Sequence, residues 1–470
     1  MAYMLDIRTF GAVGDGKTVN TAAIQKAIDE CSKGRHGTVL VAGGDYVTGT
    51  IYLKDNVMLH VASGSALLGS TRICDYSTDT HKNMYKSEPH LDRCLIFGRN
   101  ASAIGIEGNG VIDGRGFSEN FPNKEDPQQN RPMLIRLVDC SRIRFRDITL
   151  RNPAAWTSAW LYCSDIVVDG ITIHSRANYN GDGLDFDGCR NVRVTNCSFD
   201  TSDDSICLQT SRTDRPCTDV TISNCIFISQ WAGIRIGLLS RGDFSNVTVT
   251  NCVFKDIADS GLKIQMCEGG MMKNMMFSNL VMTNVPRPLF VTLCQLRACV
   301  DSPEQPAPTG SMQNLVFSNI AADSGMCGKD SAIIILGQAG HPIDTLTLSG
   351  IRLTTGGGVR EPVIPGKFPD LTQDLLKGWW PEYSCLGMTV PSHGIYADHV
   401  SRLLICNSMM ETAEADSRPA IACHDIGHLV THGIAATRGS SPIWLDGKPV
   451  CTESAGQSGL RIGVPMVHAP

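Results

Sequence analysis

The chain lacks the features that mark several large classes of protein. No stretch approaches the ~18 consecutive apolar residues of a membrane-spanning helix. The formal net charge is only −6 over 470 residues, so the sequence gives no sign of a basic surface for nucleic acid. No CxxC pair occurs among the cysteines, which removes support for a zinc cluster. Apolar residues make up 42% and charged residues 19%, a composition that suits a large folded core and not a disordered chain.

The start of the chain also lacks a recognisable targeting segment. Residues 1–10 have no basic start followed by an apolar run, so they do not resemble a signal peptide. We therefore expect a cytoplasmic protein, in which thiols stay reduced. The 19 cysteines are odd in number, so at least one of them is free. The oligomeric state does not follow from the sequence.

What the sequence does contain is a repeat. A β-type run is followed by Asn, Asp or Gly and then by two apolar residues separated by one position. The marker residues are 23, 26, 28, 27, 28, 40 and 31 positions apart, at Asp147, Gly170, Asn196, Asn224, Asn251, Asn279, Asn319 and Gly350. Spacings of 23–28 are one repeat, and the two larger spacings contain insertions. Each repeat is too short to bury its own apolar face, so neighbouring repeats must stack.

The runs alternate with period two, which is typical of strands. Short strands, frequent turns and a period in the twenties predict an all-β fold, a right-handed parallel β-helix whose strands stack ~4.8 Å apart. Leucine-rich repeats share the period but need a Leu-rich consensus that is absent. One repeat position carries Cys197, Cys225 and Cys252 where other coils have Ile or Leu. We expect these three thiols to be buried, reduced and remote from the chemistry, with Phe199, Phe227 and Phe254 as the next inward rung.

The two regions outside the repeat have their own patterns. Residues 1–40 form a predicted N-terminal cap, with a helix near residues 21–33 that begins at Asn20 as N-cap and protects the open edge of the β-helix. The loop Gly11-Ala-Val-Gly-Asp-Gly16 lacks the Lys-Ser/Thr ending of a phosphate loop. Residues 354–392 are rich in Gly and Pro and predict a long loop between coils. Strands resume at residues 393–399, and we expect one domain over residues 1–470.

The acidic residues Asp182, Asp203 and Asp204 are the main candidates for chemistry. Asp182 precedes Asp203 by 21 residues, about one coil, so the three carboxylates are expected to converge on neighbouring coils. Clustered carboxylates raise the pKa of at least one member, so one can act as an acid and another as a base. Such a pair hydrolyses glycosidic bonds. The alternatives are turn residues without a catalytic role and a calcium site from Asp182, Asp185 and Asp187, but the spacing does not give a full oxygen cage.

At this point the sequence resembles glycoside hydrolase family 28, the polygalacturonase-like β-helix enzymes. Residues 10–24 resemble the family's N-terminal cap and residues 105–114 its early-coil signature. Asn180-Gly-Asp-Gly-Leu-Asp185 is similar to the Asn-Thr-Asp-Gly-x-Asp motif, with Gly181 in place of Thr, and Asp203-Asp204 matches the Asp-Asp motif. The resemblance implies a pectate-lyase-like solenoid, Asp203 as general acid, Asp182 and Asp204 as the residues that position and deprotonate water, and inversion at the anomeric carbon.

The resemblance also implies substrate-binding residues. The family's Gly-His-Gly motif aligns with Trp231-Ala-Gly233, so Ala232 stands where the family has histidine. The Arg-Ile-Lys motif aligns with Lys263-Ile-Gln265, so one of the two cations that bind the substrate carboxylate is lost. These changes favour a glycan other than simple polygalacturonic acid. The expected substrate-binding residues are Asn180, Arg176, Arg235, Lys263, Gln265, Trp379 and Trp380, where the arginines compensate for the lost charge and the tryptophans stack on a sugar.

The function predicted for the chain is therefore a glycoside hydrolase, inverting and exo-acting, on oligosaccharides derived from pectin or a related polysaccharide. No cofactor, metal, nucleic acid or membrane partner is expected. Two alternatives remain open at this point. One is a polysaccharide lyase or glycan transferase on the same fold, and the other is a carbohydrate-binding β-helix without catalysis.

Overall fold

The computed structural model describes residues 3–34, 37–122, 130–303, 306–325, 333–361, 368–378, 380–383, 389–436, 443–450 and 460–463. The chain forms two compact units. The first unit contains Met1–Ser211, Arg215–Trp231 and Cys299–Asp301, and the second contains Arg212–Asp214, Ala232–Ala298 and Ser302–Pro470. That they act as one domain over residues 1–470 stays a prediction.

The first unit contains the α-helix α1 (Thr21–Lys33) and two short 3-10 helices (Ile7–Phe10 and Ile73–Asp75) among its strands. Its strands are β1 (Tyr3–Asp6), β2 (Asp15–Val19), β3 (Gly37–Val41), β4 (Asp45–Thr48), β5 (Ile51–Leu53), β6 (Val57–Val61), β7 (Ala66–Gly69), β8 (Cys94–Arg99), β9 (Gly105–Glu107), β10 (Val111–Asp113), β11 (Met133–Val138), β12 (Ser141–Arg146), β13 (Thr149–Arg151), β14 (Ser158–Leu161), β15 (Ser164–Asp169), β16 (Thr172–Ser175), β17 (Leu184–Asp187), β18 (Arg190–Thr195), β19 (Ser198–Thr201), β20 (Ile206–Thr210), β21 (Cys217–Ser223) and β22 (Ile226–Ser229).

The second unit contains longer strands and the short helix α2 (Gln373–Leu376). Its strands are β23 (Ala232–Ser240), β24 (Phe244–Ile257), β25 (Ser260–Met266), β26 (Met271–Thr283), β27 (Arg287–Leu293), β28 (Ser311–Asp323), β29 (Ile333–Leu336), β30 (Ile343–Thr355), β31 (Ile395–Thr412), β32 (Ile421–Ala436), β33 (Ile443–Leu445), β34 (Lys448–Pro449) and β35 (Leu460–Gly463).

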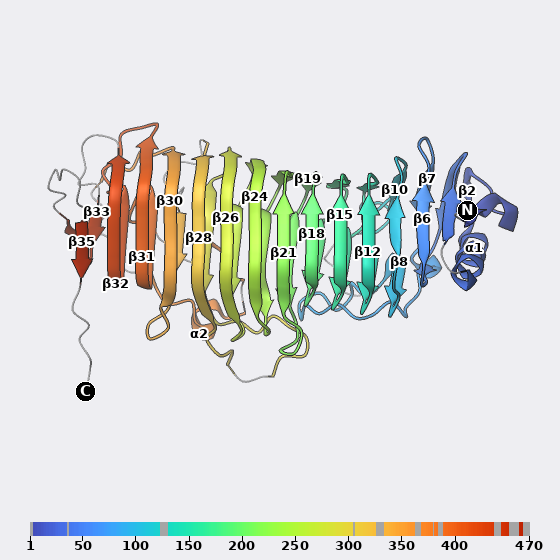
Figure 1. Cartoon of the computed structure of the whole chain (residues 1–470), viewed down its shortest axis with the longest axis horizontal. Coiled ribbons are helices and arrows are strands. Elements are labelled where there is room, and N and C mark those ends of the chain that lie inside the picture. The colour runs from blue at the N-terminus through green and yellow to red at the C-terminus, as the bar shows by residue number, and fades with distance from the viewer. Residues whose placement is uncertain are drawn as a thin grey trace. The chain divides into compact units, whose positions relative to one another are not determined.

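Both units are built from parallel coils. In the first unit each coil supplies three strands, and equivalent strands of successive coils pair in parallel. One such series is β8–β11–β14–β17–β20, and another is β12–β15–β18–β21 (Figure 1). In the second unit the last two strands of a coil merge into one long strand, so that β24, β26, β28 and β30 pair in sequence. The predicted right-handed parallel β-helix is confirmed.

The repeat markers owe their residue type to the backbone. All eight of them adopt the left-handed conformation, with φ between 53° and 68°, which Gly, Asn and Asp tolerate best. In the second unit the marker amides also bond along the stack, since Asn279 donates to Asn251 Oδ1 at 3.3 Å and Asn319 donates to Asn279 Oδ1 at 3.3 Å. The period read from the sequence therefore marks one corner in each coil.

The core follows the predicted inward rungs. Cys197, Cys225 and Cys252 are 1–2% exposed and are free thiols. The rings of Phe199 and Phe227 stack with their centroids 5.0 Å apart. The sequence analysis missed a second rung at the next corner of the first unit, formed by the buried thiols of Cys140, Cys163, Cys189 and Cys217. Cysteine thus serves as a small apolar residue at two corners of the solenoid.

The helix α1 covers the N-terminal coils with one apolar face. Ile24, Ala27, Ile28 and Cys31 are fully buried, as expected for the cap. Asn20 is the N-cap residue, as predicted, but its side chain makes no capping hydrogen bond to the helix. The Asn20 amide instead accepts from Val13 N–H at 2.7 Å and donates to the Val13 carbonyl at 3.1 Å. It fixes the turn-rich loop before the helix.

The region between β30 and β31 interrupts the coils, as predicted for residues 354–392. Within its described part, α2 is the one regular element. Strand β31 then resumes the stack at Ile395. Among the described residues, no helix is long and apolar enough to span a membrane.

Candidate active site

The three candidate aspartates lie on neighbouring coils of the first unit. Asp182 precedes β17, and Asp203 and Asp204 precede β20. Because Leu184 pairs with Ile206 in parallel register, Asp182 and Asp204 occupy equivalent positions of successive coils. The Gly183 N–H confirms this alignment by donating to the Asp204 carbonyl at 3.0 Å. Parallel stacking therefore places their side chains side by side on the same face.

The side chains of this acidic group differ in burial. Asp182 is 6% and Asp204 is 2% exposed, whereas Asp203 is half-buried. One carboxylate oxygen of Asp182, one of Asp204 and the Cys207 sulfur lie within 4.8 Å of one another. The Cys207 thiol donates to Asp204 Oδ2 at 3.6 Å. The spacing of these three groups would permit a metal ion. Two carboxylates and one thiol are not, however, the all-oxygen ligand set that calcium prefers.

Asp203 is fixed through its backbone. The hydroxyls of Thr201 and Ser229 both donate to its carbonyl oxygen, at 2.6 Å and 2.7 Å. The Asp204 N–H donates to Asp203 Oδ1 at 2.9 Å. The most accessible carboxylate of the group is thus attached to a backbone that two neighbouring hydroxyls hold in place.

Crowding and burial change the proton affinity of the acidic group. Burial raises the pKa of Asp182 well above its usual range, and the charges of Asp203 and Asp185 raise it further. Burial likewise raises the pKa of Asp185, and the charge of Asp204 adds to the effect. Like charges at this distance in a poorly solvated site cannot all ionise at once. The ligand-free group therefore retains a proton under conditions in which exposed aspartates are ionised.

Asn180, two residues before Asp182, contacts two side chains that the sequence analysis missed. Its amide oxygen accepts from Arg131 at 2.7 Å, and its amide nitrogen donates to Glu88 Oε1 at 3.1 Å. Arg131 is 1% exposed and also donates to the Ala154 carbonyl at 2.9 Å. Asn180 itself has φ 53°, which explains why Asn is favoured there. Asn180 is thus held in position beside the aspartates.

Arg176 has a different environment from the one expected. It is exposed, and its Nε donates to Asp200 on the adjacent coil. The two residues form an ion pair at the surface of the first unit. A substrate that used Arg176 would have to compete with this carboxylate.

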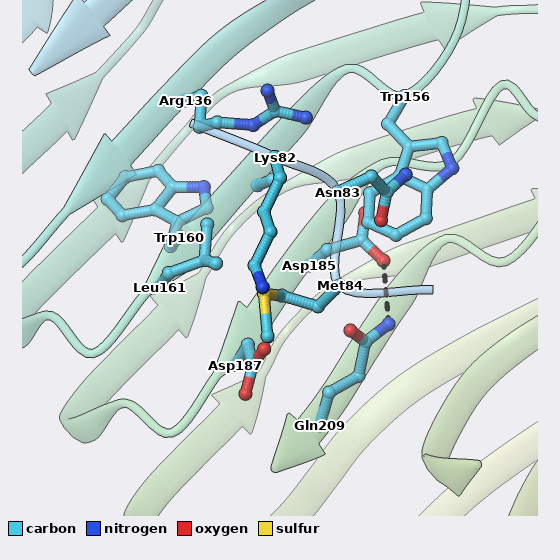
Figure 2. A pocket seen from close by; sticks show the side chains of 11 residues that line it. Lys82, Asn83, Met84, Arg136, Trp156, Trp160, Leu161, Asp185, Asp187 and Gln209 are labelled. Carbon is cyan, nitrogen blue, oxygen red and sulfur yellow. Dashed lines mark hydrogen bonds between the residues drawn. The ribbon is translucent and has the colours of Figure 1, made fainter. Parts of the chain in front are cut away.

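A segment between β7 and β8 covers the sheet face next to the aspartates. The fully buried Arg136 anchors it by donating to the carbonyls of Thr80, His81 and Leu91, at 3.1, 2.9 and 2.6 Å. Beneath the segment lies a cavity of about 10 Å³, lined by Lys82, Met84, Trp156, Asp185, Asp187, Gln209 and their neighbours (Figure 2). That volume holds about one water molecule. The sheet face is therefore closed to a sugar at this point.

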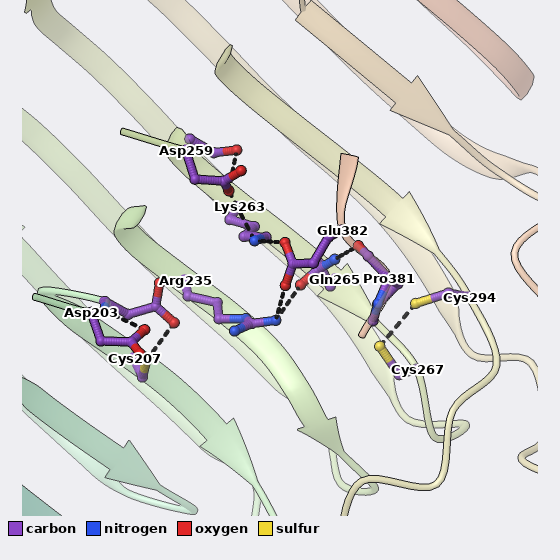
Figure 3. A network of polar contacts seen from close by, with 12 residues as sticks. Asp203, Cys207, Arg235, Asp259, Lys263, Gln265, Cys267, Cys294, Pro381 and Glu382 are labelled. Atoms are coloured by element: carbon purple, nitrogen blue, oxygen red, sulfur yellow. Dashed lines mark hydrogen bonds and ion pairs between the residues drawn. The ribbon is translucent and has the colours of Figure 1, made fainter. Parts of the chain in front are cut away.

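The remaining predicted cations lie in the second unit. Arg235 on β23 and Lys263 on β25 are register partners, and they are 6% and 0% exposed. Both contact the carboxylate of Glu382: Arg235 donates to Oε1 at 3.4 Å, and Lys263 donates to Oε2 (Figure 3). Gln265 accepts from Arg235 at 2.9 Å and donates to the Pro381 carbonyl at 2.6 Å. The three predicted binding residues thus hold a segment of the chain itself.

A second carboxylate completes this group. Lys263 also donates to Asp259 Oδ2 at 2.9 Å, and Arg287 donates to Asp259 Oδ1 at 2.8 Å. Burial alone would raise the pKa of Asp259, but the Lys263 and Arg287 cations hold it well below its usual range. The Arg287 guanidinium also lies over the Tyr383 ring, 4.7 Å from its centroid. The network is charged, buried and internally paired.

Three other residues named from the motifs remain to be placed in the structure. Ala232, which stands at the family's histidine position, is fully buried at the start of β23. Trp380 is half-buried next to Pro381. Trp379 lies outside the described residues. The roles assigned to all of these side chains remain predictions.

The fold and the site define the class of protein before any relative is considered: a right-handed parallel β-helix with clustered aspartates on neighbouring coils. The profile of glycosyl hydrolases family 28 matches residues 38–363. The chain belongs to this family and is a glycoside hydrolase. The resemblance drawn from the motifs is confirmed.

Several polygalacturonases are similar to the chain. The exo-poly-alpha-D-galacturonosidase of Dickeya chrysanthemi is 28% identical over 417 residues, which cover 75% of this chain and 68% of the relative. A probable polygalacturonase of Vitis vinifera is 28% identical over 318 residues, covering 62% of this chain and 63% of the relative. The chain thus spans only about two thirds of the length of these relatives.

Solved structures support the fold. The exopolygalacturonase of Thermotoga maritima superposes with a TM-score of 0.67 at 18% identity and covers 93% of this chain and 92% of its own. The family 28 exopolygalacturonase of Yersinia enterocolitica gives a TM-score of 0.62 at 20% identity, covering 97% and 79%. At such identities the likeness establishes the β-helix alone.

Proposed function

We propose that the chain is an inverting, exo-acting glycosidase of oligosaccharides derived from pectin. The observation that carries the proposal is the placement of Asp182 and Asp204 at equivalent positions of adjacent coils, with the more accessible Asp203 next to them. The names of the relatives point to galacturonate-containing substrates. The chemistry follows from the carboxylates of the first unit.

In the proposed reaction Asp203 is the general acid. It is the most exposed of the three aspartates, so its carboxyl group can meet the glycosidic oxygen and protonate the leaving group. Asp182 and Asp204 hold the attacking water between two oxygens, and one of them accepts the water proton. Direct displacement by water inverts the anomeric carbon.

The exo mode is supported by the segment between β7 and β8. It closes the sheet face beside the aspartates, where the remaining cavity of about 10 Å³ is far too small for a sugar ring. A long polymer running along this face would collide with the segment.

The first test replaces Asp203 by Asn. We expect kcat on a galacturonate oligosaccharide to fall by about 10²–10⁴-fold, the contribution of one general acid. The kcat of this variant on an aryl glycoside with a good leaving group should fall much less, because that leaving group departs with little protonation. The matched control is Asp45→Asn, which removes an exposed carboxylate on β4 and should leave kcat unchanged.

Two results would contradict the proposal. One is full activity of the Asp203→Asn variant on the natural type of substrate. The other is an unsaturated product with near-ultraviolet absorbance, which would identify a lyase. Product size over time tests the exo mode, since an exo enzyme releases one short product from the start.

A further inference from the structure

The first unit has a surface hollow that the proposed reaction does not use. It is lined by side chains of β6, β12, β15 and β18 and has a volume of about 360 Å³, which is within the range of small-molecule sites. The three aspartates precede strands of the other series, β14–β17–β20, whereas β12, β15 and β18 pair with one another on a separate sheet of the same unit (Figure 1). The hollow is therefore distinct from the catalytic group.

Three arginines line the hollow, and the chain itself does not neutralise them. Arg142, Arg144 and Arg193 are all exposed. The Nε of Arg142 donates to Ser102 Oγ at 3.1 Å. Within the part of the chain that the structure describes, none of the three guanidinium groups forms an ion pair. Their charges are therefore available to a ligand from solution.

The balance of charge in the hollow is positive. Asp165 supplies the one carboxylate among the described residues that line it, and its Oδ1 accepts from Asn191 Nδ2 at 2.6 Å. Three guanidinium groups against one carboxylate leave a net charge of +2, in a chain whose formal net charge is −6. Two further carboxylates of this sheet, Glu107 and Asp169, flank a fourth arginine, Arg146, in the register. The hollow thus attracts anions.

The strand register fixes the spacing of two of these cations. Arg144 pairs with Val167, and Val167 pairs with Arg193. The two arginines therefore lie two strand spacings apart in one row, about 9–10 Å, with the half-buried Val167 between them. A small anion would contact one guanidinium group alone. A chain that carries one carboxylate on each sugar can contact both, and the C–H groups of its rings can pack on the valine.

We propose that this hollow is a second carbohydrate site, which binds an acidic oligosaccharide through the carboxylates of its uronate sugars at Arg144 and Arg193. Arginine suits this ligand because its planar guanidinium group pairs with a carboxylate through two parallel hydrogen bonds. The inference rests on the proposed function for the class of sugar, because the same uronate chain is the substrate there. A chain bound in the hollow stays at the surface of the first unit, which raises the local concentration of substrate.

The test counts binding sites for hexagalacturonate by calorimetry in the Asp203→Asn background, which slows turnover. Two sites are expected, the catalytic one and the hollow. The double variant Arg144→Gln with Arg193→Gln should lose one site or weaken it at least about ten-fold. The matched control, Lys17→Gln with Lys26→Gln, removes the same charge from exposed side chains of β2 and α1. It should leave both affinities within about two-fold.

Two further measurements do not depend on the arginine variants. The fully methyl-esterified hexamer carries no carboxylate charge and should not bind in the hollow. Salt at about 1 M, where the screening length is about 3 Å, should weaken binding of the acid there at least about ten-fold. With Asp203 intact, the arginine double variant should hydrolyse digalacturonate with kcat within about two-fold of the wild type, because the hollow lies on a separate sheet from the aspartates.

Several outcomes would overturn the inference. They are a single site for hexagalacturonate, a second site that survives in the folded arginine double variant, and equal binding of the ester in the hollow. Tighter binding of hexathymidylate than of hexagalacturonate would identify a nucleic-acid surface and would also overturn it. A second site lost in the arginine variant would support the hollow even if the protein hydrolysed no galacturonate, and hydrolysis with a single site would remove the hollow and leave the glycosidase.

Discussion

Replacing Lys263 by Met should destabilise the second unit strongly. The ammonium is fully buried between Asp259 and Glu382, and removing it leaves two carboxylates in a poorly solvated site. Loss of one partner from a buried ion pair costs about 3–5 kcal/mol. Because Arg287 and Arg235 still contact these carboxylates, we expect the lower end, about 3 kcal/mol. For a unit of this size that corresponds to a fall in melting temperature of about 6–12 °C.

The assay is thermal and denaturant unfolding followed by circular dichroism. The matched control is Lys255→Met on β24, whose side chain is 60% exposed and whose loss should cost less than about 1 kcal/mol. The double variant Lys263→Met with Glu382→Gln should be more stable than Lys263→Met alone, because a neutral amide costs less to bury than a carboxylate that has lost its closer cation and keeps only Arg235 at 3.4 Å. At acid pH the loss should shrink as the carboxylates take up protons. A Lys263→Met variant as stable as the wild type, or a double variant without recovery, would refute the reasoning.

Three further predictions follow from burial in the first unit and at the inner corners. Because the pKa of Asp182 is raised well above 3.8, kcat/KM should fall as pH drops through a value above that of an ordinary aspartate; a pH profile with its acid limb near 4 would contradict this. The same pKa shift means that protonated Asp182 adds to the free energy of unfolding below about pH 3.8. This contribution is lost as the pH rises toward the pKa of Asp182 in the folded state. Asp182→Asn should therefore unfold at a higher denaturant concentration than the wild type at pH 7 but not at pH 3.5. A thiol reagent should label exposed Cys74 in the native protein and Cys197, Cys225 and Cys252 only after unfolding.

The fold could be predicted because each coil repeats one local requirement. A residue tolerant of positive φ must occupy the corner, and Asn196, Asn224 and Asn251 satisfy it. The inward positions that follow the corner must be apolar, which identified the Cys197 and Phe199 rungs. Asp182 and Asp204 could be paired for the same reason, since one coil separates them in the sequence and in space.

The rest of the site depends on segments that leave the repeat. Glu88 and Arg131 contact Asn180 from segments outside the repeat, so the spacing of the repeat does not predict where these segments lie. Glu382 lies 119 residues from Lys263, so nothing local in the sequence links them. Helix-capping preference located Asn20 as the N-cap of α1, but it could not show that the side chain bonds to the Val13 backbone. The inferred catalytic roles and the cytoplasmic location stay predictions.

The central claim is inversion by the Asp182, Asp203 and Asp204 group, and the anomer of the first product tests it most directly. Proton NMR of a fresh digest of an α-linked galacturonate oligosaccharide or its methyl ester reads the anomeric signal before mutarotation. The mechanism predicts the β-anomer as the initial product, with the α-anomer appearing only later by mutarotation. Initial release of the α-anomer would mean retention and would contradict the assignment of two aspartates to a water molecule.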